Sequence, residues 1–243
     1  MFDYQEVKIV AVTQPIIKHE TELEPGQWEG YGIKRKLTPD EFIAYCARVS
    51  NPANQNNTQT AQKLVNYLIK NEHWSPFEMV SVVMEIKTTR DIGRQILRHR
   101  SFSFQEFSQR YASVVDFAPP REARLQDKKN RQNSLETEDE KIKRRWETIQ
   151  ANQAQVIQGL YEEALASGIA KEQARAILPE GLTMSTMYMA GTLRSFYHYI
   201  CVRNHPATQK EHRDIAEKIT NAIKTQFPSL SDSIDRQIEK NYT

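Results

Sequence analysis

Few of the residues that define disulfide-rich, zinc-binding or membrane proteins occur in this sequence. Only two of its 243 residues are cysteine, and they lie far apart in no CxxC pair. This excludes a disulfide framework and a cysteine-based zinc site. No segment approaches the ~18–20 consecutive apolar residues of a membrane span, and the N-terminal apolar run is too short for a signal sequence. We therefore expect an unprocessed, cytoplasmic protein.

Glycine and net charge are scarce as well. Eight glycines occur, and none forms the GxGxxG turn or the P-loop that commonly holds nucleotide phosphates. The net charge is only +2, whereas domains that coat nucleic acid usually carry a large basic excess. Any basic feature must therefore be local. Hydrophobic residues make up 39%, enough for a core, and neither a repeat nor a linker divides the chain. We expect one domain over residues 1–243.

Strand and helix signals alternate along the chain, which favours an α+β fold. Thr38, followed by proline and two acids, is a compact helix-start signal. Asn57 or Thr58 is expected to cap the next helix, with Leu64, Tyr67 and Leu68 on one face. The expected elements are a buried strand over 7–12, a loop over 24–39, helices over 39–49 and 89–97, a strand in MVSVVMEIK, a mobile polar excursion over 117–146, a long helix over 146–167, a short helix in AKEQARAIL, a strand in LTMSTMYMAG, and helices over 192–204 and 208–226.

The most informative stretch is RHRSFSFQEFSQRY, residues 98–111. It follows a predicted helix on which Arg90, Arg94 and Arg98 share one side, where like charges repel by ~0.2–0.5 kcal/mol per pair. A bound anion, or acids from elsewhere in the fold, would neutralise them. Serine and phenylalanine then alternate with a strand period that breaks near Glu106. The break predicts a turn beside arginines, which is a plausible phosphate cradle.

Two interpretations of this stretch stay open from the residues alone. In the first, the phenylalanines fill the core and the arginines form ordinary salt bridges, which is the better account of any single arginine. In the second, the set binds an anionic ligand. The protein would then be either an enzyme or a non-catalytic nucleotide- or RNA-binding module in which Phe102, Phe104 and Phe107 stack on bases.

The stretch closely resembles the RHRxxSxNxxSxR motif of flavin-dependent thymidylate synthases. The motif's asparagine is Gln105 here, a longer amide with the same hydrogen-bonding groups. Other segments resemble family blocks in the expected order: HWSPFE at 73–78, followed by Met79 where many members have histidine, GRQILRHR at 93–100, ARAILP at 174–179 and LRSFYHYICVR at 193–203. Together they cover most of the chain from about 40 to 225.

The resemblance implies a central, mostly antiparallel sheet flanked by helices, in a homotetramer with FAD sites between subunits. It also implies a reaction, the methylation of dUMP to dTMP, in which methylenetetrahydrofolate gives the carbon and NADPH reduces FAD. No nucleic acid, membrane or metal takes part in such a reaction.

The resemblance also assigns site residues. Arg203 matches a residue thought to help ionise the uracil, and a guanidinium can stabilise negative charge on the pyrimidine. Thr192, His198 and Ala207 depart from the residues usual in the family. The positions matching FAD contacts are His73, Ser75, Glu78, Arg98, His99, Arg100, Ser101, Glu106, Thr192, Arg194, His198 and Val202. Those matching dUMP contacts are Gln95, Arg98, Glu106, Phe107, Ser108, Gln109, Arg110, Arg175 and Arg203.

Several further residues have simpler interpretations. Cys46 and Cys201 fall in helical apolar patterns and are expected to be packing residues. Ser108 is better suited to bind phosphate than to act as a nucleophile. The histidines at 198, 205 and 212 have weak metal-site spacing, since Pro206 interrupts their helix. The methionines at 184, 187 and 189 are expected in the core. The segment 141–147 is expected to be a solvated helix start, with a folate-tail contact as the alternative.

Overall fold

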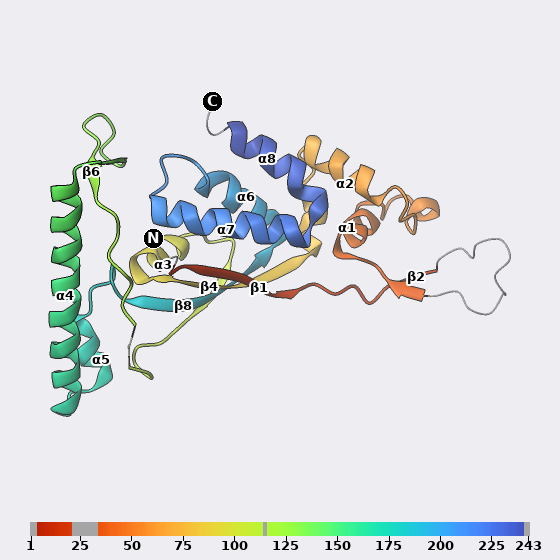
Figure 1. Ribbon diagram of the computed structural model, residues 1–243. Coiled ribbons are helices and arrows are strands. Elements are labelled where there is room, and N and C mark those ends of the chain that lie inside the picture. Colours follow the sequence, from red (N-terminus) through yellow and green to blue (C-terminus); the bar gives the residue numbers. More distant parts are fainter. Residues whose placement is uncertain (1–3, 21–33, 114–115, 241–243) are drawn as a thin grey trace.

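A four-stranded antiparallel sheet forms the centre of the computed structural model, which describes residues 4–20, 34–113 and 116–240. Its strand order is β1 (Glu6–Val12), β4 (Ser81–Thr89), β8 (Met184–Thr192) and β5 (Ser103–Glu106). Helices lie over it, as Figure 1 shows. The predicted α+β class and antiparallel sheet are confirmed.

One face of the sheet carries the core. In β4 the residues Val82, Met84 and Ile86 are fully buried, whereas the alternate residues between them are not. The buried face packs beneath α3 (Arg90–Ile96), α6 (Leu193–Arg203) and α7 (Lys210–Gln226) (Figure 1). On the other face Tyr188 donates a hydrogen bond to Glu85 over 2.7 Å. The alternation of side chains along the strand therefore gives the sheet one apolar face and one polar face.

A smaller helical group covers one end of the core. Helix α1 (Pro39–Ala47) begins with the predicted signal, because Thr38 and Glu41 form a reciprocal capping box. The remaining elements there are η1 (Pro52–Asn54), α2 (Ala61–Lys70), η2 (Ser75–Met79), η4 (Pro228–Leu230) and α8 (Ser231–Lys240).

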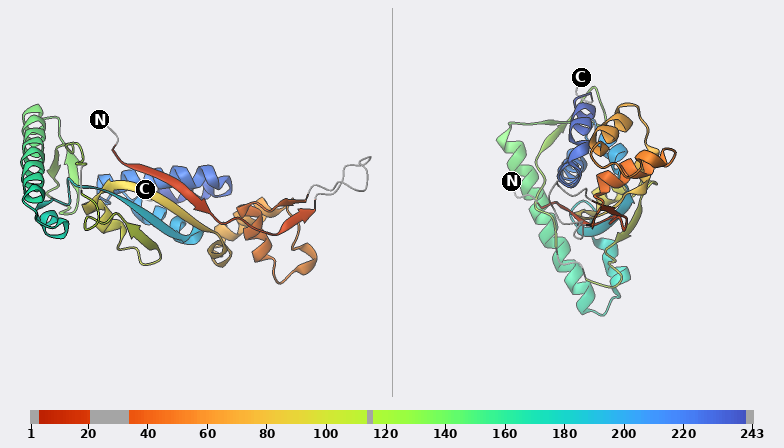
Figure 2. Two further views of the ribbon diagram at one scale, coloured as in Figure 1. Left: turned by 90° about the horizontal axis from the view of Figure 1, so that it is seen from below. Right: turned by 90° about the vertical axis from the view of Figure 1, so that its right-hand side faces the viewer.

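The polar excursion is built differently from the prediction. It contains a hairpin of β6 (Arg124–Gln126) and β7 (Ser134–Glu136). Helix α4 (Glu140–Ala166) follows, starting before residue 146 because the carboxylate of Asp139 accepts from two backbone N–H groups of the first turn. Helices α4, α5 (Lys171–Ala174) and η3 (Arg175–Ile177) lie at one end of the molecule, and the hairpin of β2 (Lys18–Glu20) and β3 (Lys34–Lys36) lies at the other (Figure 2).

Several local predictions were wrong. Strand β1 is not buried, because it lies at the edge of the sheet and, among the described residues, pairs with β4 alone. β3 lies within the predicted loop, of which residues 24–33 are outside the described part. Thr60, not Asn57 or Thr58, precedes α2 and makes no side-chain cap. The predicted face of α2 is right for Leu68, which is buried with Ala61, Val65 and Ile69, and for Leu64, which packs against the core, but it is wrong for Tyr67, which is 55% exposed. Helix α8 was not predicted. Among the described residues, no helix combines the length and apolarity needed to cross a bilayer.

A close approach between Gly191 and Phe102 gives the first testable expectation. A Cβ atom at Gly191 would lie 2.3 Å from the Phe102 ring, which is itself buried against Phe196 and Tyr199. Gly191→Ala should therefore lower the free energy of unfolding by about 1–3 kcal/mol, as overpacking does. Urea denaturation measures this loss. Phe102→Leu in the same chain should recover part of it, and an unchanged midpoint in the single variant would contradict the expectation.

Candidate functional site

The arginines of α3 are neutralised by acids from elsewhere in the fold. Arg90 Nη1 lies 3.2 Å from Glu106 Oε1, and Arg94 Nη1 lies 3.5 Å from Glu106 Oε2. Arg94 also pairs with Glu180 at 3.0 Å. For these two arginines the salt-bridge interpretation is correct. Because α3 ends at Ile96, Arg98 does not continue their row.

Arg98 and Arg100 behave differently. Both are exposed, and within the described part of the chain neither forms an ion pair. Ser101, which follows them, is exposed as well. Two unpaired guanidinium groups separated by one residue suit the oxygens of a phosphate or pyrophosphate. Within the motif, these are the two exposed cations for which the described structure gives no ion pair.

His99 points the other way and holds Arg203. Arg203 Nε donates to His99 Nε2 over 2.7 Å, although the two residues are 104 positions apart. Burial, together with the positive charge of Arg203, lowers the pKa of His99 to about 4. The imidazole is therefore neutral and free to accept, and it fixes the guanidinium at the end of α6.

The structure adds two residues that the sequence analysis did not assign to the site. The Tyr199 ring lies 4.8 Å from the ring of His99 and forms a hydrogen bond with the fully buried His212. Burial and the charge of Arg203 lower the pKa of His212 to about 3. The only sequence signal was a histidine on the apolar face of a helix.

The lowered pKa values of the half-buried His99 and the fully buried His212 predict that the fold is sensitive to acid. In the unfolded chain they take up protons near pH 6.5, whereas the folded pKa values are about 4 for His99 and about 3 for His212. The unfolded state therefore binds more protons as pH falls from 6.5 toward 4, and the stability present above pH 6.5 is lost by at most about 1.4 kcal/mol per pH unit for each histidine. Urea denaturation between pH 6.5 and 4 should show this fall in the free energy of unfolding, and its slope against pH should be shallower for His212→Asn. Parallel slopes would contradict it.

A second group of predicted residues meets between η2 and α6. Glu78 forms an ion pair with Arg194, and the ring of His198 lies 5.2 Å from Trp74. Thr192 accepts from the backbone N–H of Ser195 and so caps α6. His73, Ser75, His198 and Val202 are exposed beside these contacts.

A third group surrounds the turn after β5. Gln109 is only 5% exposed, and its Nε2 has no hydrogen-bond partner in the described structure. The backbone N–H of Arg110 donates to Ser108 Oγ over 3.4 Å. Glu172 lies between Arg110 Nε, at 3.5 Å, and Arg175 Nε, which donates to its carbonyl over 3.3 Å. The predicted turn is confirmed, and it leaves a buried donor without a partner.

The predicted residues do not converge on one point of the chain. Strand β5 separates them, since Ser103 pairs with Ala190 near α6 and Glu106 pairs with Met187 toward the turn. Three residue steps of a strand span about 10 Å. A ligand spanning both groups, or a second copy of the chain, is needed to bring them together.

The other candidates settle as follows. Burial raises the pKa of Cys201 to about 11 and also raises that of Cys46, so neither thiol is activated. Met184, Met187 and Met189 are buried, as predicted. The segment 141–147 forms the exposed start of α4. Among the described residues no cluster of histidine, cysteine and acids has metal-site geometry.

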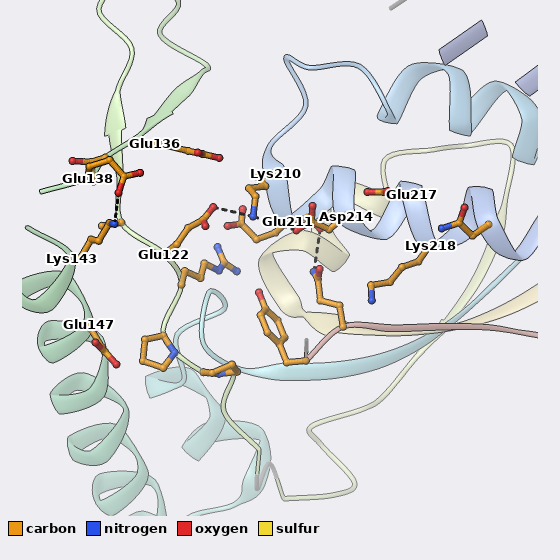
Figure 3. A pocket seen from close by; sticks show the side chains of 18 residues that line it. Glu122, Glu136, Glu138, Lys143, Glu147, Lys210, Glu211, Asp214, Glu217 and Lys218 are labelled. Carbon is orange, nitrogen blue, oxygen red and sulfur yellow. Dashed lines mark hydrogen bonds and ion pairs between the residues drawn. The ribbon is translucent and has the colours of Figure 1, made fainter. Parts of the chain in front are cut away.

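A pocket of about 780 Å³ lies elsewhere, between α7 and the segment that leads from the turn to α4 (Figure 3). Its lining includes seven carboxylates, among them Glu122, Glu211 and Asp214, and only four cations. Such a wall disfavours phosphate groups. None of the predicted site residues lines it.

Comparison with known proteins identifies the family. Residues 33–229 match the family described as thymidylate synthase complementing protein. A relative from Paramecium bursaria Chlorella virus 1, described as a probable flavin-dependent thymidylate synthase, is 46% identical over 228 residues, which are 94% of this chain and 98% of the relative. The chain belongs to the flavin-dependent thymidylate synthase family. A second member, the flavin-dependent thymidylate synthase of Synechocystis sp., is 46% identical over 230 residues, 95% of this chain and 99% of that one.

Solved structures support the fold of this family. The crystal structure of the UMP/dUMP methylase PolB from Streptomyces cacaoi, bound with 5-Br dUMP, superposes with a TM-score of 0.75. The match covers 96% of this chain and 95% of that one at 23% identity. The antiparallel sheet with helices over it is therefore shared with that methylase.

Proposed function

We propose that this chain is a cytoplasmic enzyme that methylates dUMP reductively to dTMP, with methylenetetrahydrofolate as carbon donor and NADPH as reductant of FAD. The observation that carries the proposal is the pairing of a neutral His99 with Arg203, beside the exposed cations Arg98 and Arg100. The guanidinium of Arg203 would be held in place for the reaction, and those of Arg98 and Arg100 would bind phosphate groups.

The residues present fit a flavin. Arg98 and Arg100, which have no ion-pair partner in the described structure, would meet the pyrophosphate. The surface of η2 and α6 offers exposed polar groups and the edge of an aromatic pair for the rest of FAD. FAD would supply hydride transfer when bound. The residues proposed to hold it are His73, Ser75, Glu78, Arg98, His99, Arg100, Ser101, Glu106, Thr192, Arg194, His198 and Val202.

The turn after β5 fits the substrate. Three groups supply donors for dUMP: the Nε2 of Gln109, which has no partner among the described residues, the hydroxyl of Ser108 and the guanidinium of Arg110. Arg203, held by His99, would stabilise the negative charge that develops on the pyrimidine and so make carbon 5 more nucleophilic. The residues proposed to bind dUMP are Gln95, Arg98, Glu106, Phe107, Ser108, Gln109, Arg110, Arg175 and Arg203.

The proposed assembly is a homotetramer, and α4 offers a surface for it. Five exposed apolar side chains, 39–59% accessible, recur at intervals of three, four or seven residues along this 27-residue helix. They form a stripe that another helix can cover. The helix is basic over 141–145 and acidic at 162–163, so antiparallel pairing with a second copy brings opposite charges together. The stripe consists of Ile142, Trp146, Ile149, Val156 and Leu160.

A charge placed in this stripe should therefore disrupt assembly. Ile149→Glu is expected to shift the protein to a smaller species in size-exclusion chromatography with light scattering, because a carboxylate would be buried unpaired. Gln155→Glu adds the same charge at an exposed position outside the stripe of the same helix and should leave the mass unchanged. Equal masses for the two variants would remove α4 from the interface.

One assay tests the whole proposal. The purified protein should show or acquire a flavin spectrum, and it should oxidise NADPH in a dUMP-dependent manner with methylenetetrahydrofolate, forming dTMP. Absence of dTMP would refute the activity. A colourless protein that binds RNA with a steep salt dependence would instead support the non-catalytic binding module.

A further inference from the structure

A chain of buried and partly buried hydrogen bonds leads to Gln95, one of the proposed dUMP contacts. His212 is fully buried on α7, with Nε2 2.9 Å from the hydroxyl of Tyr199 and Nδ1 3.1 Å from Gln95 Oε1. Gln95 Nε2 lies 2.7 Å from Gln209 Oε1, and Gln209 Nε2 lies 2.9 Å from Glu211 Oε2. The chain joins α6, α7 and α3, which no local sequence signal connects.

The carboxylate of Glu211, at the end of this chain, determines which group donates in each of its hydrogen bonds. Burial opposes ionisation of Glu211, but the hydrogen bond from Gln209 and the charges of Arg124 and Arg121 outweigh it and lower the pKa of this carboxyl. An ionised carboxylate only accepts. Gln209 must therefore direct its NH₂ to Glu211 and its oxygen to Gln95.

The orientation of Gln209 fixes that of Gln95 and His212. Gln95 donates its NH₂ to Gln209 and must turn its oxygen toward His212. His212 then carries its proton on Nδ1 and donates it to Gln95, while Nε2 accepts from Tyr199. One tautomer and one amide orientation satisfy all the partners.

We propose that His212 is a positioning residue that locks the side-chain amide of Gln95 in a single orientation for binding dUMP, an inference that rests on the proposed function. Without His212, the amide of Gln95 would keep only its hydrogen bond to Gln209 and could swing about that bond, so its oxygen would no longer be held in place. A preformed orientation saves the ordering cost on binding. The second N–H of Gln95 and the second lone pair of its oxygen remain for the nucleotide.

Two substitutions of His212 separate positioning from packing. Asparagine places its NH₂ near the position of Nδ1 and keeps the donation to Gln95, but it is smaller and leaves a cavity. Glutamine fills more of the space, yet its polar atoms fall near Nε2 and serve Tyr199 instead. His212→Gln should raise the KM for dUMP about tenfold, the worth of one buried hydrogen bond, with kcat changed much less. His212→Asn should keep a KM near that of the wild type while lowering the melting temperature more.

A purely structural role predicts the opposite order in KM, with asparagine the more harmful variant there as well as in melting temperature. That order, or a wild-type KM in both variants, would overturn the proposal. Absence of dTMP formation by the wild-type protein would instead refute the proposed function itself.

A second measurement needs no variant. Nitrogen-15 correlation spectra of the histidine-labelled wild-type protein should show neutral His212 with its proton on Nδ1. A proton on Nε2 would reverse the bond to Gln95 and overturn the proposal even if both substitutions prevented folding.

Discussion

Replacing Arg203 by alanine is expected to lower kcat/KM for dUMP by about 10²–10³-fold, the loss seen when one fixed donor to a developing negative charge is removed. The cause lies in the contact with His99. The imidazole accepts from Arg203 Nε over 2.7 Å and holds the guanidinium in place before substrate arrives. A neutral acceptor orients the cation without neutralising its charge.

The control and the conservative variant sharpen this expectation. Arg236→Ala removes a guanidinium from an exposed position on α8 and should leave the turnover unchanged. Arg203→Lys keeps the charge but loses the planar fork, so it should recover only part of the activity. Flavin content should stay near the wild-type level in all three variants. Full activity of Arg203→Ala would remove this residue from the mechanism but leave the family assignment intact.

The sequence was most informative where a function constrains several residues at fixed spacing. The stretch from Arg98 to Arg110 identified the family, and the helix start at Thr38 was confirmed because capping is decided within four residues. Strand β1 could not be placed correctly in the same way. Its β-branched residues suit a strand, but its position at the sheet edge depends on β4, which lies more than 60 residues away.

Contacts with residues far away in the sequence also explain why the surroundings of several site residues could not be predicted. Arg90 and Arg98 have the same helical spacing to Arg94, yet one is buried against Glu106 and the other is exposed beyond the end of α3. The histidines at 205 and 212 differ in the same way, since the first is exposed and the second is buried beneath Tyr199. Periodicity gives the side of a helix, but tertiary packing decides which charges and rings cover that side.

Glu106→Ala is expected to destabilise the fold by about 3 kcal/mol, because it leaves a buried guanidinium without its counter-charge. Arg90 is only 8% exposed, and the structure gives it Glu106 at 3.2 Å as its ion-pair partner. Ser185 Oγ, which donates to the same carboxylate over 3.0 Å, would also lose its acceptor. Urea denaturation measures the loss, with Glu138→Ala, which breaks an exposed pair with Lys143, as the matched control that should show little or no change. If the buried charge is the cause, Arg90→Met should restore much of the stability when it is added to Glu106→Ala, although it should be destabilising by itself. Additive losses in the double variant would show that the two residues stabilise the fold independently.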